Sequence, residues 1–196
     1  MASDLRSAPL VSLRMTPSSS DASVTEILHQ AYAAARRYRD DAALIIVLHM
    51  GAEHCGVAFG QGPESDLVKL LPLGTGRLAR DQFKTSPPTL LALENAIQVV
   101  EDSVMPLRAV IPREALLFSV DAGVREIALL SGLEPTESMH LSLDAMERTF
   151  NRLVAVVEGS PAARLPESNN FAATLLILRE FMHHLQYSHI AVLHAQ

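Results

Sequence analysis

The sequence predicts an α/β (or α+β) fold. A mixed sheet that begins with an antiparallel β-meander would be covered by about four to five α-helices. Short apolar runs near the start and middle of the chain are typical of buried strands. Elsewhere, apolar residues recur at alternating spacings of three and four, the periodicity of amphipathic helices. The 196 residues, 48% hydrophobic and 19% charged, are enough to fill one sizeable core.

We expect residues 21–196 to form a single α/β domain after a mobile N-terminal tail over residues 1–20, in which residues 10–15 could instead form a short edge strand. The tail lacks the basic start and long apolar stretch of a secretory signal. The single cysteine cannot form an internal disulfide, which favours a cytoplasmic location. The longest apolar run, residues 42–48, is far shorter than the roughly 18 residues that a membrane span needs, so we expect no membrane insertion.

The charge of the chain argues against nucleic acid as a partner. The formal net charge is −6, whereas a nucleic-acid binder needs a concentrated basic field. The densest basic run is Arg36-Arg37-Tyr38-Arg39, and Asp40 and Asp41 follow it directly. This run is typical of a helix C-terminus, where cations offset the helix dipole.

The first elements of the domain are predicted to be a helix and three strands. A helix from Val24 to Arg39 is indicated by Ser23 and Glu26, which have the spacing of a capping box. The next segment is apolar almost throughout, as in a strand covered on both faces. The strands expected to form the meander are residues 42–49, 55–59 and 66–71.

The second half of the chain is predicted to be mainly helical. Residues 73–85 are polar and irregular, and Ser86-Pro87-Pro88 would open a helix that ends at Pro106. The long helices carry narrow apolar seams, which fit a helical layer packed on the sheet or pairing with a second copy in a homodimer. The elements expected after Pro106 are a strand at 115–120, helices at 124–130, 141–158 and 170–186, and a strand at 188–194.

Two predicted strands end in a polar residue followed closely by glycine, in Leu48-His49-Met50-Gly51 and Val120-Asp121-Ala122-Gly123. If these strands are parallel neighbours, His49 and Asp121 lie at the same sheet edge, where open α/β sheets bind ligands. The aspartate would then orient the imidazole and raise its basicity, as a general base requires. The alternatives are that Asp121 caps the following helix and that His49 bonds to a turn backbone.

A glycine-containing loop provides a candidate anion site. Gly74 and Gly76 would leave backbone amides facing an anion, and Arg77 and Arg80 would add positive charge. The spacing matches neither a P-loop nor the dinucleotide-binding pattern, because Ala79 replaces the last glycine of the latter. A simple connecting loop is the alternative.

A metal site is predicted only if distant histidines meet, as a set of His49, His54 and His184. His54 and Cys55 are adjacent on a strand and point to opposite faces, so they cannot easily share one ion. Glu180 lies four residues before His184 and could join it on a metal or a proton, although a solvated helix pair is the plainer interpretation. A buried Cys55 acting as a small apolar residue is favoured over a nucleophile. The sequence does not identify a cofactor.

The order of three strands, helix, strand and helix resembles ribonuclease-H-like and actin-like folds. Those folds carry an acidic residue on the first strand, where this chain ends the strand with His49. The resemblance therefore implies a fold and no function.

Two functions follow from these features. The first is a soluble small-molecule-binding or assembly module that is dimeric. The alternative is a hydrolase-like enzyme acting on a small anionic substrate, with His49 as general base, Asp121 as its orienting group, and Arg77 or Arg80 as the anion anchor. The enzyme requires that His49 and Asp121 lie within hydrogen-bond reach, or bridged by one water, inside a cleft.

Overall fold

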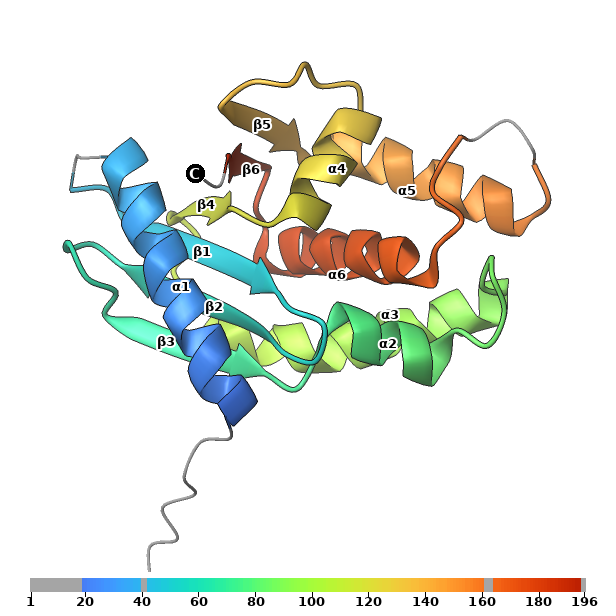
Figure 1. The fold of residues 1–196 in the computed structure, drawn as a ribbon, viewed down its shortest axis with the longest axis horizontal. Helices are drawn as coiled ribbons and strands as arrows, with labels where there is room; N and C mark the ends of the chain where they lie inside the picture. Colours follow the sequence, from blue (N-terminus) through green and yellow to red (C-terminus); the bar gives the residue numbers. More distant parts are fainter. Residues whose placement is uncertain (1–18, 40–41, 161–163, 195–196) are drawn as a thin grey trace, which may run out of the picture.

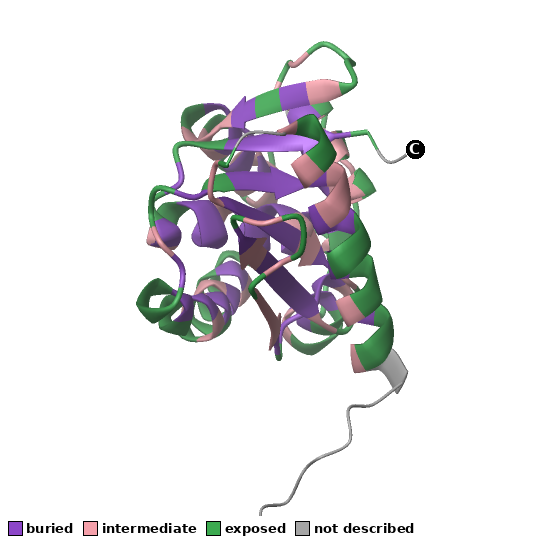
Figure 2. Ribbon diagram, turned by 90° about the vertical axis from the view of Figure 1, so that its left-hand side faces the viewer, coloured by how far each residue is buried: buried purple, intermediate pink, exposed green. Residues whose placement is uncertain are grey.

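The computed structural model describes residues 19–39, 42–160 and 164–194. These residues form a six-stranded mixed sheet between two unequal layers of helices. Helix α1 covers one face, and the other helices cover the opposite face (Figures 1 and 2). The predicted α/β class is confirmed, with six α-helices in the described ranges instead of four to five.

The sheet has the strand order β3-β2-β1-β4-β6-β5. The first three strands form the predicted antiparallel meander, and β4 then pairs in parallel with β1. Strand β6 is parallel to β4, and β5 closes the far edge antiparallel to β6. The strands are β1 (Ile45–Met50), β2 (Cys55–Gly60), β3 (Leu67–Leu71), β4 (Leu116–Ser119), β5 (Ser138–Ser142) and β6 (His189–Leu193).

Strand β1 is buried on both faces, as its unbroken apolar run predicts. Ile46 and Leu48 lie in the core shared with the main helical layer. Ile45 and Val47 pack in the second, smaller core under α1. Burying each such side chain stabilises the fold by roughly 1.5–3 kcal/mol, so β1 is a rigid central support for the residues that follow it.

Helix α1 (Ser19–Tyr38) begins earlier than predicted. Ser23 lies inside the helix, so the capping-box prediction is wrong. The Thr25 hydroxyl donates to the backbone carbonyl of Asp21, a bond that hydroxyl side chains make inside helices. Residues 1–18 of the predicted tail, including the possible edge strand, lie outside the described residues, and Ser19 and Ser20 are helical.

Helix α2 (Thr75–Gln82) occupies a segment that was expected to be irregular. Its N-cap is Gly74, which has no side chain to signal a helix start. The β1–β2 turn replaces the missing cap, because the amides of Thr75 and Arg77 donate to the carbonyls of Gly51 and Ala52. The helix start is therefore set by a contact between distant segments.

The remaining helices follow the predicted pattern closely. Helix α3 (Leu90–Val104) is capped by Thr89, whose hydroxyl accepts from the amide of Ala92, and not by Ser86 as predicted. A short 3₁₀ segment, η1 (Met105–Ala109), continues it. The others are α4 (Ala122–Leu130), α5 (Leu143–Val157) and α6 (Asn169–Leu185).

Strand β5 was not predicted. Only Met139 and Leu141 alternate inward in it, with His140 exposed between them. The segment pairs on one side only, with β6, and leads directly into α5. Two inward residues at an edge are too few for a period-two signal.

The apolar seams pack inside the chain. Helix α6 lies between α3 and α5, and its buried face meets theirs in one core (Figure 1). This confirms the helical-layer interpretation, and the homodimer stays a prediction. No helix of the described residues combines the length and apolar character that crossing a membrane requires.

Candidate functional site

The parallel pairing of β1 with β4 brings His49 and Asp121 to the same edge of the sheet. Their side chains meet there, with His49 Nδ1 lying 2.6 Å from Asp121 Oδ1. Both side chains are 13% exposed, so the pair is shielded yet open to solvent. The predicted proximity of these two residues is confirmed.

Backbone bonds hold the Asp121 carboxylate in place. The second carboxylate oxygen, Oδ2, accepts from the backbone amide of Met50 at 2.7 Å. The backbone amide of Asp121 donates to the hydroxyl of Ser119. Asp121 occupies the N-cap position of α4, but its carboxylate is turned toward β1 and does not cap the helix. The capping interpretation is therefore wrong, because both carboxylate oxygens are bonded to His49 and Met50 of the neighbouring strand.

The orientation of the His49 ring decides its chemistry. A carboxylate at Nδ1 favours the tautomer that carries the proton there, which leaves the lone pair on Nε2. A Cβ at position 51 would lie 3.3 Å from Nε2 and 2.5 Å from the carbonyl oxygen of His54. Glycine at this position thus permits a tight turn and keeps the space beside Nε2 open. The arrangement suits a base that accepts a proton at Nε2.

The glycines of the predicted anion loop serve close packing. A Cβ on Gly74 would lie 2.3 Å from the carbonyl oxygen of Ala52, and one on Gly76 would lie 3.2 Å from the same atom. The amides of Thr75 and Arg77 are already bonded to the β1–β2 turn. The loop therefore ties α2 to the turn that follows His49.

Arg77 and Arg80, both on α2, differ in their partners. Arg80 forms a bidentate pair with Glu53 at 2.9 and 3.1 Å, and this bond lowers the pKa of the Glu53 carboxyl and raises the pKa of Arg80. Arg77 is about half exposed and faces Asp81 at the longer distance of 3.8 Å. Arg77 is thus the more loosely held cation of the two.

The predicted metal set of His49, His54 and His184 is not formed. His54 Nδ1 faces Asp21 of α1 at 3.5 Å. His184 lies in the last turn of α6, and the chain then leads into β6. Strand β6 runs parallel to β4, which is parallel to β1. His184 therefore lies at the edge where these strands begin, whereas His49 lies where β1 ends.

Cys55 is fully buried in β2. Burial raises the pKa of its thiol, so the thiol stays protonated at neutral pH. This agrees with the interpretation of Cys55 as a small apolar residue.

The sequence indicated only part of a cluster that Glu101, Glu180 and His184 form. His184 Nε2 lies 3.0 Å from Glu101 on α3 and 3.1 Å from Glu180 one turn earlier on α6. Glu180 is 1% exposed, so the solvated-pair interpretation is wrong. The i,i+4 spacing indicated the pair on α6, but Glu101 comes from a helix distant in sequence, and no local pattern points to it.

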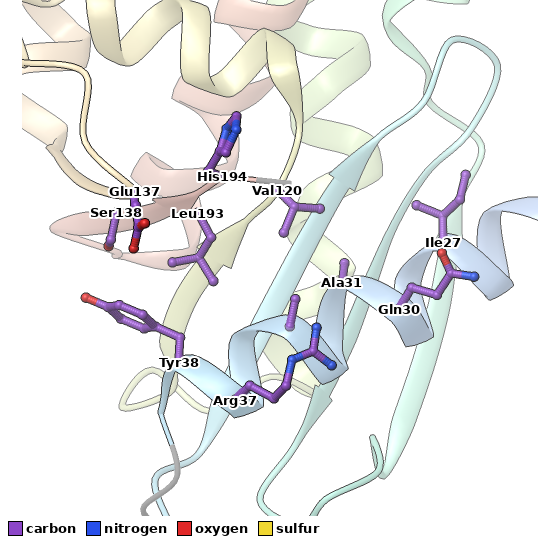
Figure 3. A pocket seen from close by; sticks show the side chains of 11 residues that line it. Ile27, Gln30, Ala31, Arg37, Tyr38, Val120, Glu137, Ser138, Leu193 and His194 are labelled. Atoms are coloured by element: carbon purple, nitrogen blue, oxygen red, sulfur yellow. The ribbon is translucent and has the colours of Figure 1, made fainter. Parts of the chain in front are cut away.

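A groove of about 520 Å³ lies beside the strand ends, on the face that carries α1. Figure 3 shows Arg37 and Tyr38 of α1 on one side and Glu137, Leu193 and His194 on the other. Its wall includes Val120, the residue before Asp121. The groove offers both apolar and charged surface, and neither His49 nor Asp121 is among the residues that line it.

No protein-family model matches the sequence, and no curated protein matches it either. Solved structures of similar fold include the following three. The Aquifex aeolicus PPX-GPPA enzyme has a TM-score of 0.72 at 17% identity, over 87% of this chain and 60% of that one. The type II variant of the Aquifex aeolicus Ppx/GppA phosphatase has a TM-score of 0.69 at 16% identity, over 85% and 59%. An exopolyphosphatase from Cytophaga hutchinsonii has a TM-score of 0.68 at 15% identity, over 88% and 59%.

The chain spans about three fifths of the length of these structures. At such low identity the likeness concerns the fold. The sheet and helices described above therefore form a fold similar to a large part of Ppx/GppA-type phosphatase structures.

Proposed function

We propose that this chain binds a small phosphate-type anion at the strand-end site and takes part in its hydrolysis, with His49 as general base. The observation that carries the proposal is the hydrogen bond between His49 Nδ1 and Asp121. The structures of similar fold are named as phosphatases and exopolyphosphatases, which favours hydrolysis over a purely binding or assembly role.

In the proposed reaction, His49 Nε2 accepts a proton from a water molecule while the oxygen of that water attacks the phosphorus of the substrate. The bond from phosphorus to the leaving oxygen breaks, that oxygen takes up a proton from solvent, and the His49 imidazolium then returns its proton to solvent. Asp121 stabilises the imidazolium that forms, and the amide of Met50 keeps the carboxylate aligned. Such proton transfer contributes a rate factor of roughly 10² to 10⁴.

We assign the anion-anchoring role to Arg77. Helix α2 starts on the turn that follows His49, so Arg77 lies on an element attached directly to the site. Its contact with Asp81 is long, which lets the side chain turn toward a substrate. Arg80 is less suited, because both of its terminal nitrogens are engaged by Glu53.

Three further predictions belong to this proposal. The net charge of −6 supports a small anionic ligand over nucleic acid as the partner. The single cysteine supports a cytoplasmic location. We keep the homodimer as a prediction that sedimentation of the full chain tests.

The test measures phosphate release from inorganic polyphosphate and from p-nitrophenyl phosphate by the full chain. His49→Ala should lower the rate by about 10²- to 10⁴-fold. His189→Ala is the matched control, because this exposed histidine lies at the start of β6, where the strands begin. The proposal is overturned if the wild-type chain releases no phosphate above buffer, or if His49→Ala retains the wild-type rate.

A further inference from the structure

Three metal-ligating groups converge where α6 ends, at the edge of the sheet away from His49. Glu180 and His184 lie one turn apart on α6, and Glu101 faces them from α3. One atom from each residue, His184 Nε2 and one oxygen from each carboxylate, lies within 4.8 Å of the other two. The groups come from two helices that pack directly on each other.

The hydrogen bonding of this cluster is short of a donor. His184 Nε2 approaches both carboxylates at 3.0 and 3.1 Å, but it carries at most one proton. That proton can point directly at only one oxygen, so one carboxylate is left facing the ring nitrogen without a good bond. A cation at the centre would satisfy the nitrogen and both oxygens together.

The buried carboxylate is held in an orientation that suits a ligand. Arg179 donates to one oxygen of Glu180, which leaves the other oxygen facing His184. Two groups position the guanidinium of Arg179. The Glu147 carboxylate lies 3.3 Å from Nε, and the centre of the Phe150 ring lies 4.7 Å from Cζ. Glu180 is therefore both desolvated and aimed at the point where the three atoms meet.

The charges around the cluster favour a cation. The carboxylates of Glu101, Glu147 and Glu180 gather here, against the guanidinium groups of Arg179 and Arg108. Arg108 donates to the backbone carbonyl of His184 at 2.6 Å and holds the end of α6 on η1. With a neutral imidazole, as metal binding requires, the negative charges exceed the positive ones by one.

We propose that Glu101, Glu180 and His184 bind a zinc ion that fastens α3 to α6, with water in the fourth position. Zinc accepts imidazole nitrogen and carboxylate oxygen in a tetrahedral set, at about 2.0–2.2 Å. Magnesium and calcium are hard cations that prefer oxygen ligands, whereas this cluster includes an imidazole nitrogen, which suits zinc better. The proposal does not depend on the hydrolytic function, because the two sites use different residues.

The test titrates Zn²⁺ alone into the full chain after treatment with a chelator, by calorimetry at neutral pH. We expect one ion per chain and a rise of about 5 °C in the unfolding midpoint with excess zinc. Glu101→Gln should weaken binding by at least about tenfold. This residue is partly exposed, so its variant should fold, and circular dichroism checks that it does.

His183→Ala is the matched control, because His183 is the neighbouring histidine of the same helix and its side chain is more than half exposed. It should bind zinc like the wild-type chain, and Mg²⁺ and Ca²⁺ should not compete. The zinc site is excluded if uptake does not saturate at one ion per chain. It is also excluded if Glu101→Gln and His184→Ala both bind as tightly as the wild type. Phosphate release measured on Glu101→Gln keeps the two proposals separate, since it should be unchanged.

Discussion

His49 and His184 both face carboxylates, but through different ring nitrogens. Asp121 bonds to Nδ1 of His49, whereas Glu101 and Glu180 approach Nε2 of His184. The first arrangement leaves Nε2 directed away from its partner, ready to accept a proton. The second draws Nε2 and two carboxylates to a common point, ready for a cation. The engaged nitrogen, more than the presence of a carboxylate, separates the base that we propose from the metal ligand that we propose.

Exposure does not explain this difference. The two histidine side chains are 13% and 18% exposed, so solvent reaches them to a similar extent. The backbone explains it better. His49 is the penultimate residue of β1, and Asp121 lies just after the parallel strand β4. His184 lies one helical turn after Glu180 on α6, where the side chains of residues i and i+4 meet.

The largest effect should come from Asp121→Asn, which reverses the tautomer of His49. The amide group of asparagine can still accept from Met50, but it presents N–H to Nδ1 and so shifts the ring proton to Nε2. We expect kcat for phosphate release to fall by about 10²- to 10⁴-fold with the fold retained. Steady-state kinetics with circular dichroism measure this, and an unchanged kcat would remove Asp121 from the proposed mechanism.

A second effect should come from the turn that supports the His49 site. Gly74→Ala places a Cβ 2.3 Å from a backbone oxygen that cannot move away easily. We expect the free energy of unfolding to fall by about 1–3 kcal/mol. Urea denaturation measures the change, and Gly62→Ala is the control, because its Cβ would meet its nearest neighbour at an ordinary 3.7 Å. Equal stability of the two variants would mean that the turn is not tightly packed.

The smallest effect should come from Arg80→Ala, which removes the exposed pair with Glu53. This bond lowers the pKa of Glu53, so its stabilisation is present above the ordinary value of 4.5 and disappears as the pH falls through the lowered pKa. The unfolding midpoint of Arg80→Ala should lie slightly below that of the wild type at neutral pH and converge with it in acid. A large gap that persists in acid would show that Arg80 acts through packing.

Much of the fold could be predicted because the signals are local. The apolar run of β1, the alternation in β2 and the helical periods of α3, α5 and α6 each depend on neighbours in sequence. Helix α2 and strand β5 could not be predicted in this way. The first is capped by carbonyls of a distant turn, and the second is a short edge strand with two inward residues.

The candidate site likewise has features that local sequence predicts and features that it does not. Strand ends at His49 and Asp121 were visible in the sequence, since a polar residue and a glycine stop each apolar run. The sequence alone therefore determined the α/β class, the meander and which polar side chains lie close to the ends of β1 and β4. Only the tertiary structure decided that Asp121 binds Nδ1, that Arg80 is held by Glu53, and that Glu101 joins His184. These contacts join residues that are 27 to 83 positions apart in the sequence. Strand order and helix packing bring them together, and no short window of sequence contains that information.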